Sequence, residues 1–260
     1  LKVISDTAQA PGATYKGRWA GTCAHVGGYS LNYHKHIHTG EGGIMVTDDD
    51  QIAKRLQLIR NHAEVVLGDR GVPNANTSDL INMVGYNFRL GEIECAIGIE
   101  QLKKLKSLVA SRQKLAAELT DGLQDLDGLM TPFVKPDRNH VYYNYPLQVD
   151  LDLLGITRDR ICEAINAEGV FVSQRYQNLH LLPIYQKKIA FGSNGFPWTS
   201  DIIHRDVDYS KGICPVAEML NDKTYMGFGL CSYDLDLNDI GIIVDAIKKV
   251  WDNLDYLHYE

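Results

Sequence analysis

The sequence is most distinctive between Gly27 and Gly43, where it reads GGYSLNYHKHIHTGEGG. Glycines at both ends of this stretch allow tight turns and a close approach of the backbone to a ligand. The one lysine between them, Lys35, carries an amine whose pKa falls readily when water is excluded. Lys35 is therefore a candidate nucleophile for a Schiff base, and the alternative is a solvated lysine at the surface of a loop.

Histidines flank this lysine at positions that alternate along the chain, His34, His36 and His38. In an extended segment such positions project from one face, and three imidazoles on one face can bind a metal ion. Acidic or cysteine ligands with a regular spacing are absent nearby. We therefore expect no metal site here.

Further polar segments accompany this stretch: DTAQ at 6–9, GYNFR at 85–89 and LHLLPIY at 179–185. Together with Ser30, Lys35 and the TGEGG of residues 39–43, they resemble the motifs of the DegT/StrS-type (DegT/DnrJ) sugar aminotransferases. That family consists of enzymes that use pyridoxal 5'-phosphate and have the aspartate-aminotransferase fold. The motifs extend over most of the chain, so the resemblance is specific.

The resemblance implies four cofactor contacts within one subunit. Lys35 forms a Schiff base with pyridoxal 5'-phosphate and moves a proton as general base and acid. Asp6 lies beside the ring nitrogen and keeps it protonated, Gln9 binds near the cofactor hydroxyl, and Ser30 donates to the phosphate. Taken without the resemblance, Asp6 also fits an aspartate that caps a turn, and Gln9 a surface glutamine.

The resemblance also implies contacts with a partner subunit and with substrate. Asn87 reaches the cofactor phosphate of the neighbouring subunit, which makes a homodimer part of the mechanism. His180 and Arg89 bind the sugar substrate. Without the resemblance, Asn87 and Arg89 fit polar loop groups ahead of a helix, and His180 fits a loop histidine next to Pro183.

The implied function is the transfer of an amino group from glutamate to a keto sugar, which we expect to be nucleotide-linked, for amino-sugar and surface polysaccharide biosynthesis. Members of the family carry a further N-terminal segment before the position of Leu1, so we expect the chain to be N-terminally truncated. The alternative is a non-catalytic remnant that dimerises or binds substrate. Retained pyridoxal phosphate, visible as a yellow colour, would distinguish the two.

The expected fold is α/β. Residues 1–108 would form the C-terminal half of the large, cofactor-binding domain of a fold type I transferase, and residues 109–260 a smaller α+β domain. Apolar periodicity predicts helices after the aspartates at 48–50 and over 92–123, 157–168 and 238–254. Strands are predicted at 2–4, 28–31, 43–46, 141–149 and 170–173.

Composition narrows the class of protein. Lys and Arg total 26 against 33 Asp and Glu, a net charge of -7 that argues against a nucleic-acid partner. The five cysteines have no regular spacing, which indicates reduced thiols and a cytoplasmic setting. No apolar run approaches the length of a membrane span, so we expect no membrane association.

Overall fold

The computed structural model describes residues 1–64, 83–174 and 176–258, and the chain divides into two compact units. Unit 1 comprises Leu1–Ala117, Phe133–Asn144 and Gly229–Leu235. Unit 2 comprises Glu118–Pro132, Tyr145–Phe228 and Asp236–Glu260. The loop predicted between Asn61 and Leu90 lies in large part outside the described residues.

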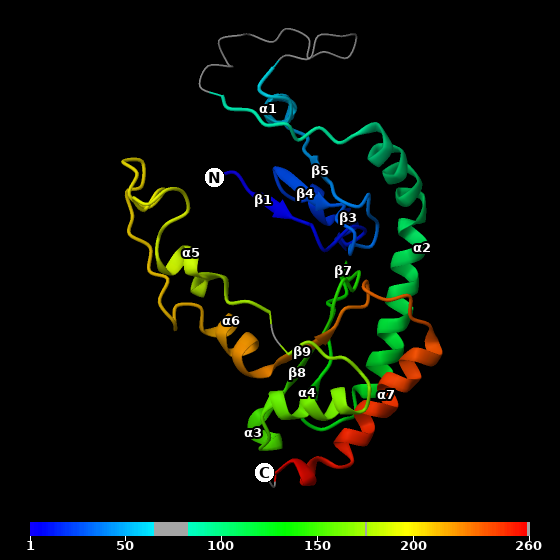
Figure 1. Cartoon of the computed structure of the whole chain (residues 1–260). Coiled ribbons are helices and arrows are strands. Elements are labelled where there is room, and N and C mark those ends of the chain that lie inside the picture. The colour runs from blue at the N-terminus through cyan, green and yellow to red at the C-terminus, as the bar shows by residue number, and fades with distance from the viewer. Residues whose placement is uncertain (65–82, 175, 259–260) are drawn as a thin grey trace. The chain divides into compact units, whose positions relative to one another are not determined.

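Over residues 1–64 and 83–117 and its two later segments, unit 1 contains short strands, the helices α1 and α2 and the 3-10 turn η1 (Figure 1). Its elements are β1 (Ile4–Asp6), β2 (Thr14–Tyr15), β3 (Arg18–Trp19), η1 (Ala20–Thr22), β4 (Val26–Ser30), β5 (Gly43–Val46), α1 (Asp50–Arg60), most of α2 (Glu92–Leu123) and β7 (Arg138–Asn139). Helix α2 continues into unit 2. None of the helices in the described part of the chain is both long and apolar enough to cross a membrane.

The main sheet of unit 1 has the strand order β1-β4-β5. β1 runs parallel to β4, with Asp6 opposite Gly28, and β5 runs antiparallel to β4, with Ser30 opposite Gly43. At Gly27 an added Cβ would overlap the backbone of Gly21, so only glycine lets β4 pass this close to η1. The sheet thus places the ends of β1 and β4 beside each other.

Unit 2 packs helices against a sheet of order β6-β8-β9. Its elements are β6 (Leu129–Met130), β8 (Tyr145–Val149), α3 (Leu151–Leu154), α4 (Arg158–Ala167), η3 (Leu179–Leu181), α5 (Pro183–Gln186), α6 (Pro215–Met219), the π-helical turn η4 (Leu220–Thr224), β9 (Tyr225–Phe228), α7 (Leu237–Trp251) and η5 (Leu254–His258). Its fully buried side chains include Tyr145, Leu147, Ile161, Met226 and Ile247. Alternate residues of β8 therefore form one side of the core, as the period of a strand requires.

Side-chain caps start several of the helices, of which the sequence indicated the aspartate cap of α1. The Asp49 carboxylate accepts from the backbone N–H groups of Gln51 and Ile52 at the start of α1. Thr157 caps α4, and Asp236 forms a reciprocal capping box with Asp239 at the start of α7. Such caps satisfy the first N–H groups of a helix, which have no partner within it.

Four of the five predicted strands differ from the structure. β1 covers Ile4–Asp6, not residues 2–4, and β4 covers Val26–Ser30, not residues 28–31. β8 begins at Tyr145, not at residue 141, because the backbone of Tyr142 has a φ of 51° and interrupts the extended conformation. The strand predicted at 170–173 is wrong: of these residues only Ser173 pairs, in an isolated bridge with Gly227. Val172 is nevertheless 1% exposed and Phe171 is 71% exposed. The alternating sequence pattern therefore predicted correctly which side chains are buried, although the segment forms no strand.

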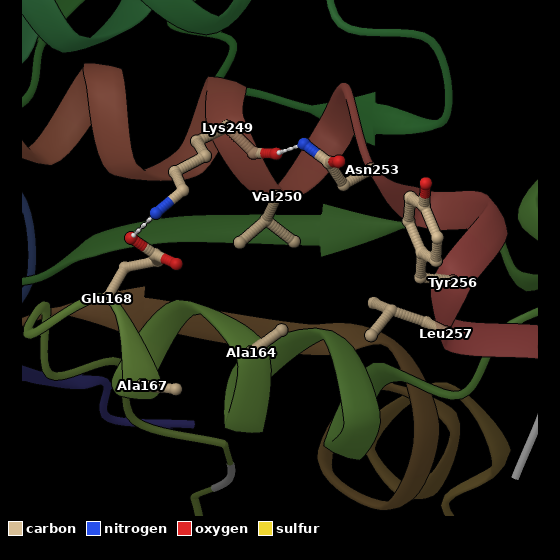
Figure 2. Close-up of a pocket in the computed structure, with 8 residues that line it drawn as sticks. All are labelled: Ala164, Ala167, Glu168, Lys249, Val250, Asn253, Tyr256 and Leu257. Atoms are coloured by element: carbon tan, nitrogen blue, oxygen red, sulfur yellow. Dashed lines mark hydrogen bonds and ion pairs between the residues drawn. The ribbon is translucent and has the colours of Figure 1, made fainter.

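A pocket of about 290 Å³ lies in unit 2 between α4, α7 and η5 (Figure 2). It is lined by Ala164, Ala167, Glu168, Lys249, Val250, Asn253, Tyr256 and Leu257. Its charged groups, Glu168 and Lys249, form an ion pair with each other at 2.6 Å. None of the site residues predicted from the sequence lines it.

Arg158 joins the start of α4 to the turn η4. Its side chain is 2% exposed. The guanidinium donates to the backbone carbonyls of Asn221 at 3.2 Å, Asp222 at 3.2 Å and Tyr225 at 2.8 Å, and to the carboxylate of Asp159 at 2.6 Å. The planar guanidinium can serve these acceptors together, which a lysine ammonium cannot.

Replacing Arg158 with methionine is expected to lower the free energy of unfolding by about 2–3 kcal/mol, because three carbonyl groups lose a charged donor. Urea unfolding followed by circular dichroism measures this change. The matched control is Lys248→Met, an exposed cation on α7, which should change the free energy by less than about 0.5 kcal/mol. Equal effects of the two substitutions would contradict a specific role for Arg158.

Candidate active site

The loop between β4 and β5 carries Lys35 and is closed by its own hydrogen bonds. Leu31 N donates to Gly42 O at 2.9 Å, and Thr39 N donates to Leu31 O at 3.0 Å. Lys35 N donates to Asn32 O at 3.0 Å. These bonds hold the backbone on both sides of Lys35, so its side chain starts from a fixed position.

The amine of Lys35 lies against an aromatic ring of the same unit. Nζ is 4.3 Å from the ring centroid of Tyr143. Burial lowers the pKa of Lys35 from its ordinary value, and the nearby Cys231 and Asp6 partly oppose the shift. A lowered pKa increases the fraction of unprotonated amine near neutral pH, which is the nucleophilic and basic form.

Asp6 and Ser30 stand at the carboxyl ends of β1 and β4. Asp6 Oδ1 accepts from Ala8 N at 3.1 Å, while Oδ2 accepts no hydrogen bond from the described residues. Ser30 Oγ accepts from Asn32 N at 3.2 Å and keeps its own hydrogen for donation. Gln9 is exposed in the turn after β1. Unit 1 therefore brings Asp6, Ser30 and Lys35 to one end of its sheet, where ligands of open α/β sheets bind.

Asn87 and Arg89 lie elsewhere in unit 1, against the end of α1. Asn87 forms an isolated bridge with Asn61, and Arg89 Nη1 donates to Asn61 Oδ1 at 2.8 Å. Asn87 and Arg89 are both exposed. Within the described residues, no hydrogen bond joins either of them to Lys35.

Two of the histidines around Lys35, His34 and His36, lie near the ring of Tyr143, with ring centroids 6.0 and 6.4 Å from it. His36 is 3% exposed, and its Nε2 lies 2.6 Å from the carbonyl oxygen of Val141. Burial lowers the pKa of His36, which favours the neutral ring. Over residues 1–64, 83–174 and 176–258 there is no group of three or more His, Cys, Asp or Glu residues that could hold a metal ion.

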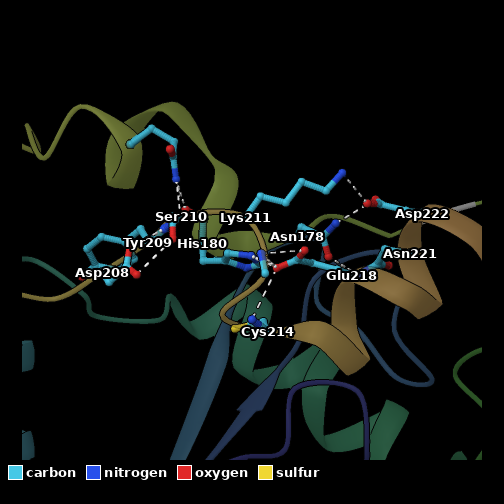
Figure 3. Close-up of polar contacts among 12 residues, drawn as sticks. Asn178, His180, Asp208, Tyr209, Ser210, Lys211, Cys214, Glu218, Asn221 and Asp222 are labelled. Atoms are coloured by element: carbon cyan, nitrogen blue, oxygen red, sulfur yellow. Dashed lines mark hydrogen bonds and ion pairs between the residues drawn. The ribbon is translucent and has the colours of Figure 1, made fainter.

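His180 belongs to unit 2 and is held by a residue that the sequence did not indicate. His180 Nε2 donates to Glu218 Oε1 at 2.8 Å (Figure 3). Glu218 is 7% exposed and also accepts from Gly212 N at 2.7 and 2.9 Å and from Cys214 N at 3.3 Å. These hydrogen bonds hold the pKa of the Glu218 carboxyl below its ordinary value. The bond from the Gly212 N–H has the largest effect, and those from His180 and Cys214 add to it.

Residues 1–210 match the model of the DegT/DnrJ/EryC1/StrS aminotransferase family. The spore coat polysaccharide biosynthesis protein SpsC of Bacillus subtilis is 31% identical over 76% of this chain and 51% of that protein. GDP-perosamine synthase of Caulobacter vibrioides is 30% identical over 71% of this chain and 47% of that protein. The chain thus spans about half the length of these curated relatives.

The same likeness holds in three dimensions. The crystal structure of the aminotransferase from Psychrobacter cryohalolentis superimposes with a TM-score of 0.76 at 29% identity, over 98% of this chain and 63% of that one. The fold is that of fold type I transferases, and the family's enzymes use pyridoxal 5'-phosphate. The resemblance inferred from the motifs is confirmed: the chain belongs to the DegT/DnrJ/EryC1/StrS aminotransferase family.

Proposed function

We propose that the whole protein is an aminotransferase that transfers an amino group from glutamate to a nucleotide-linked keto sugar, for amino-sugar and surface polysaccharide biosynthesis. The observation that carries this proposal is that a loop fixed by hydrogen bonds holds the amine of Lys35 4.3 Å from the ring centroid of Tyr143, at the end of the sheet where Asp6 and Ser30 stand. The names of two relatives, a spore coat polysaccharide biosynthesis protein and GDP-perosamine synthase, support a sugar substrate.

The side chains at the ends of β1 and β4 fit pyridoxal 5'-phosphate by their chemistry. The cofactor presents an aldehyde, a phosphate and a pyridine nitrogen. A primary amine at Lys35, a hydroxyl at Ser30 and a carboxylate at Asp6 complement these groups in turn. The Ser30 hydroxyl retains its hydrogen, and Asp6 Oδ2 has no donor among the described residues. We propose that these residues hold the cofactor.

When bound, the cofactor supplies an electron sink that makes removal of a proton from the substrate carbon feasible. Lys35 would act as the general base that takes this proton and then as the general acid that returns it. The ring of Tyr143 covers one side of Nζ and limits where the amine can move. Asp6 would favour the protonated form of a pyridine nitrogen placed beside it.

The remaining predicted residues keep the roles that the family motifs imply, as proposals. Gln9 would contact the cofactor in its own subunit, and Asn87 the phosphate of the cofactor in a partner subunit. Arg89 and His180 would contact substrate. In support, Asn87 and Arg89 are exposed, and His180 Nδ1 makes no hydrogen bond within the described residues.

An amino-transfer assay tests the function directly. The full protein is loaded with pyridoxal 5'-phosphate and given glutamate with each of a panel of nucleotide-linked keto sugars. We expect glutamate alone to give at most one equivalent of 2-oxoglutarate per bound cofactor, and continued formation only when a keto sugar is present, the further 2-oxoglutarate matching the amino sugar formed. A loaded protein that forms no product with any of the sugars would point to the non-catalytic alternative.

We also propose that the protein acts as a homodimer, because unit 1 exposes large apolar side chains close together in sequence. Tyr86 is 52% exposed, Phe88 66% and Ile93 75%. The rings of Tyr86 and Phe88 stack on each other with centroids 4.9 Å apart. Exposed apolar groups of this size are typical of protein interfaces.

Sedimentation velocity of the full protein is expected to give a dimer, and Phe88→Asp is expected to weaken the dimerisation at least about tenfold, since a charge would then be buried. The control is Phe133→Asp, at a residue of unit 1 that is 84% exposed and distant in sequence from Phe88. This control should leave the dimerisation unchanged. A monomer at working concentration would remove the role proposed for Asn87.

A further inference from the structure

The carboxylate of Glu218 is the centre of a hydrogen-bond cluster in unit 2 (Figure 3). It lies in the first turn of α6, with its side chain 9% exposed. It accepts three N–H donors from two segments, namely the ring of His180 and the backbone of Gly212 and Cys214. One buried carboxylate therefore ties the turn η3 to the loop that precedes α6.

This contact determines which ring nitrogen of His180 carries hydrogen. An ionised carboxylate can only accept hydrogen bonds, so Nε2, 2.8 Å away, must be the donor. The two backbone N–H groups keep Glu218 ionised, because they stabilise its charged form. In the neutral ring Nδ1 is then an acceptor, and it has no hydrogen-bond partner within the described residues.

The backbone that carries His180 is fixed independently of the ring. Gln186 Nε2 donates to the carbonyl oxygens of His180 at 2.8 Å and Tyr209 at 2.6 Å. Asn178, two residues before His180, accepts from Asn221 at 3.0 Å and donates to Asp222 at 2.9 Å. With both backbone and ring held, the direction of Nδ1 is set before any substrate binds.

We propose that Glu218 is a positioning residue that locks His180 in its Nε2–H tautomer, so that Nδ1 accepts a hydrogen bond from a hydroxyl group of the sugar substrate. This inference rests on the proposed role of His180 as a substrate contact and specifies its chemistry. A lone pair at Nδ1 attracts a hydroxyl donor and repels a phosphate oxygen. His180 would therefore bind a hydroxyl group of the sugar and not the phosphates of a nucleotide-linked substrate.

The tautomer is measured by NMR of full protein labelled with 15N-histidine, without substrate. We expect a pyrrole-type 15N shift at Nε2 of His180 and a pyridine-type shift at Nδ1. Glu218→Ala is expected to give a mixture of tautomers, and Glu218→Gln to preserve the wild-type pattern, because the amide oxygen still accepts from Nε2. His180→Asn identifies the signals by their loss.

The matched control is Glu168→Ala, which removes a carboxylate of the same unit that is paired with Lys249. It should leave the His180 signals unchanged, and far-ultraviolet circular dichroism checks that every variant is folded. The inference is overturned if Nδ1 carries the hydrogen in the wild type, or if Glu218→Ala keeps a single Nε2–H tautomer.

Kinetics then separate the inference from the function on which it rests. Glu218→Ala should raise KM for the keto sugar about tenfold, the value of one hydrogen bond, with KM for glutamate and kcat nearly constant. A normal KM in His180→Ala would overturn the hydroxyl contact. A wild-type protein without amino-transfer activity would refute the proposed function alone, because the tautomer is read without substrate.

Discussion

Replacing Lys35 with arginine or alanine in the full protein is expected to reduce amino transfer by at least about 10⁴-fold, the upper end of what a general acid–base group contributes. Arginine keeps the positive charge but offers no unprotonated primary amine, and alanine has no amine at all. The matched control is Lys114→Arg, an exposed lysine of α2 in the same unit, which should retain activity. The rate of 2-oxoglutarate formation measures all three variants.

Borohydride reduction locates the amine involved. Full protein incubated with pyridoxal 5'-phosphate and then reduced should carry the pyridoxyl group on the peptide that contains Lys35. The lowered pKa of Lys35 means that this reaction sets in at lower pH than at an ordinary lysine, since burial disfavours the ammonium form. A reduced adduct on Lys16 or Lys54 in place of Lys35 would end the assignment.

Asp6→Asn is expected to lower kcat by about 10²- to 10³-fold, the range seen when one electrostatic group is removed from an active site. The amide is neutral and no longer favours a protonated pyridine nitrogen. The free energy of unfolding should stay nearly constant, because the side-chain oxygen of asparagine can still accept from Ala8 N, as Asp6 Oδ1 does at 3.1 Å. Steady-state kinetics and urea unfolding measure the two quantities.

The comparison of Asp6→Asn with Asp6→Ala separates the two interpretations of this residue. If Asp6 only caps the turn after β1, the alanine variant loses stability, and both variants keep full activity in the folded fraction. If Asp6 acts on the cofactor, both variants lose turnover, and only the alanine variant also loses stability.

The sequence predicted best those elements that repeat a local pattern. The helix expected over 92–123 has the same bounds in the structure, because its apolar spacing persists over many turns and glycine precedes it at Gly91. The predicted strand at 170–173 failed for the opposite reason. Val170 and Val172 are buried, but a strand also needs a hydrogen-bonded neighbour, and no local pattern reports one.

The same distinction applies to the candidate site. Lys35, Ser30 and Asp6 could be found because they occur in short motifs, and the fold then brings them to one end of a sheet. Tyr143 and Glu218 were missed, although one lies 4.3 Å from the Lys35 amine and the other 2.8 Å from the His180 ring. Both contacts join segments that are distant in sequence. In the sequence alone, Glu218 is indistinguishable from an ordinary acidic residue in the first turn of a helix that begins at Pro215.

The way in which Glu218 holds the preceding loop has a consequence for how the sequence of this loop can diversify. Gly212 and Cys214 contribute only backbone N–H groups to the carboxylate, so the bond itself does not depend on their side chains. Gly212 is restricted by its φ of 103°, whereas residues 208–211 and 213 face no such restriction from this anchor. Mutation can therefore vary the chemistry of the loop while its position is inherited unchanged. With His180 in its proposed role at the sugar, this is a favourable starting point for the evolution of new sugar preferences.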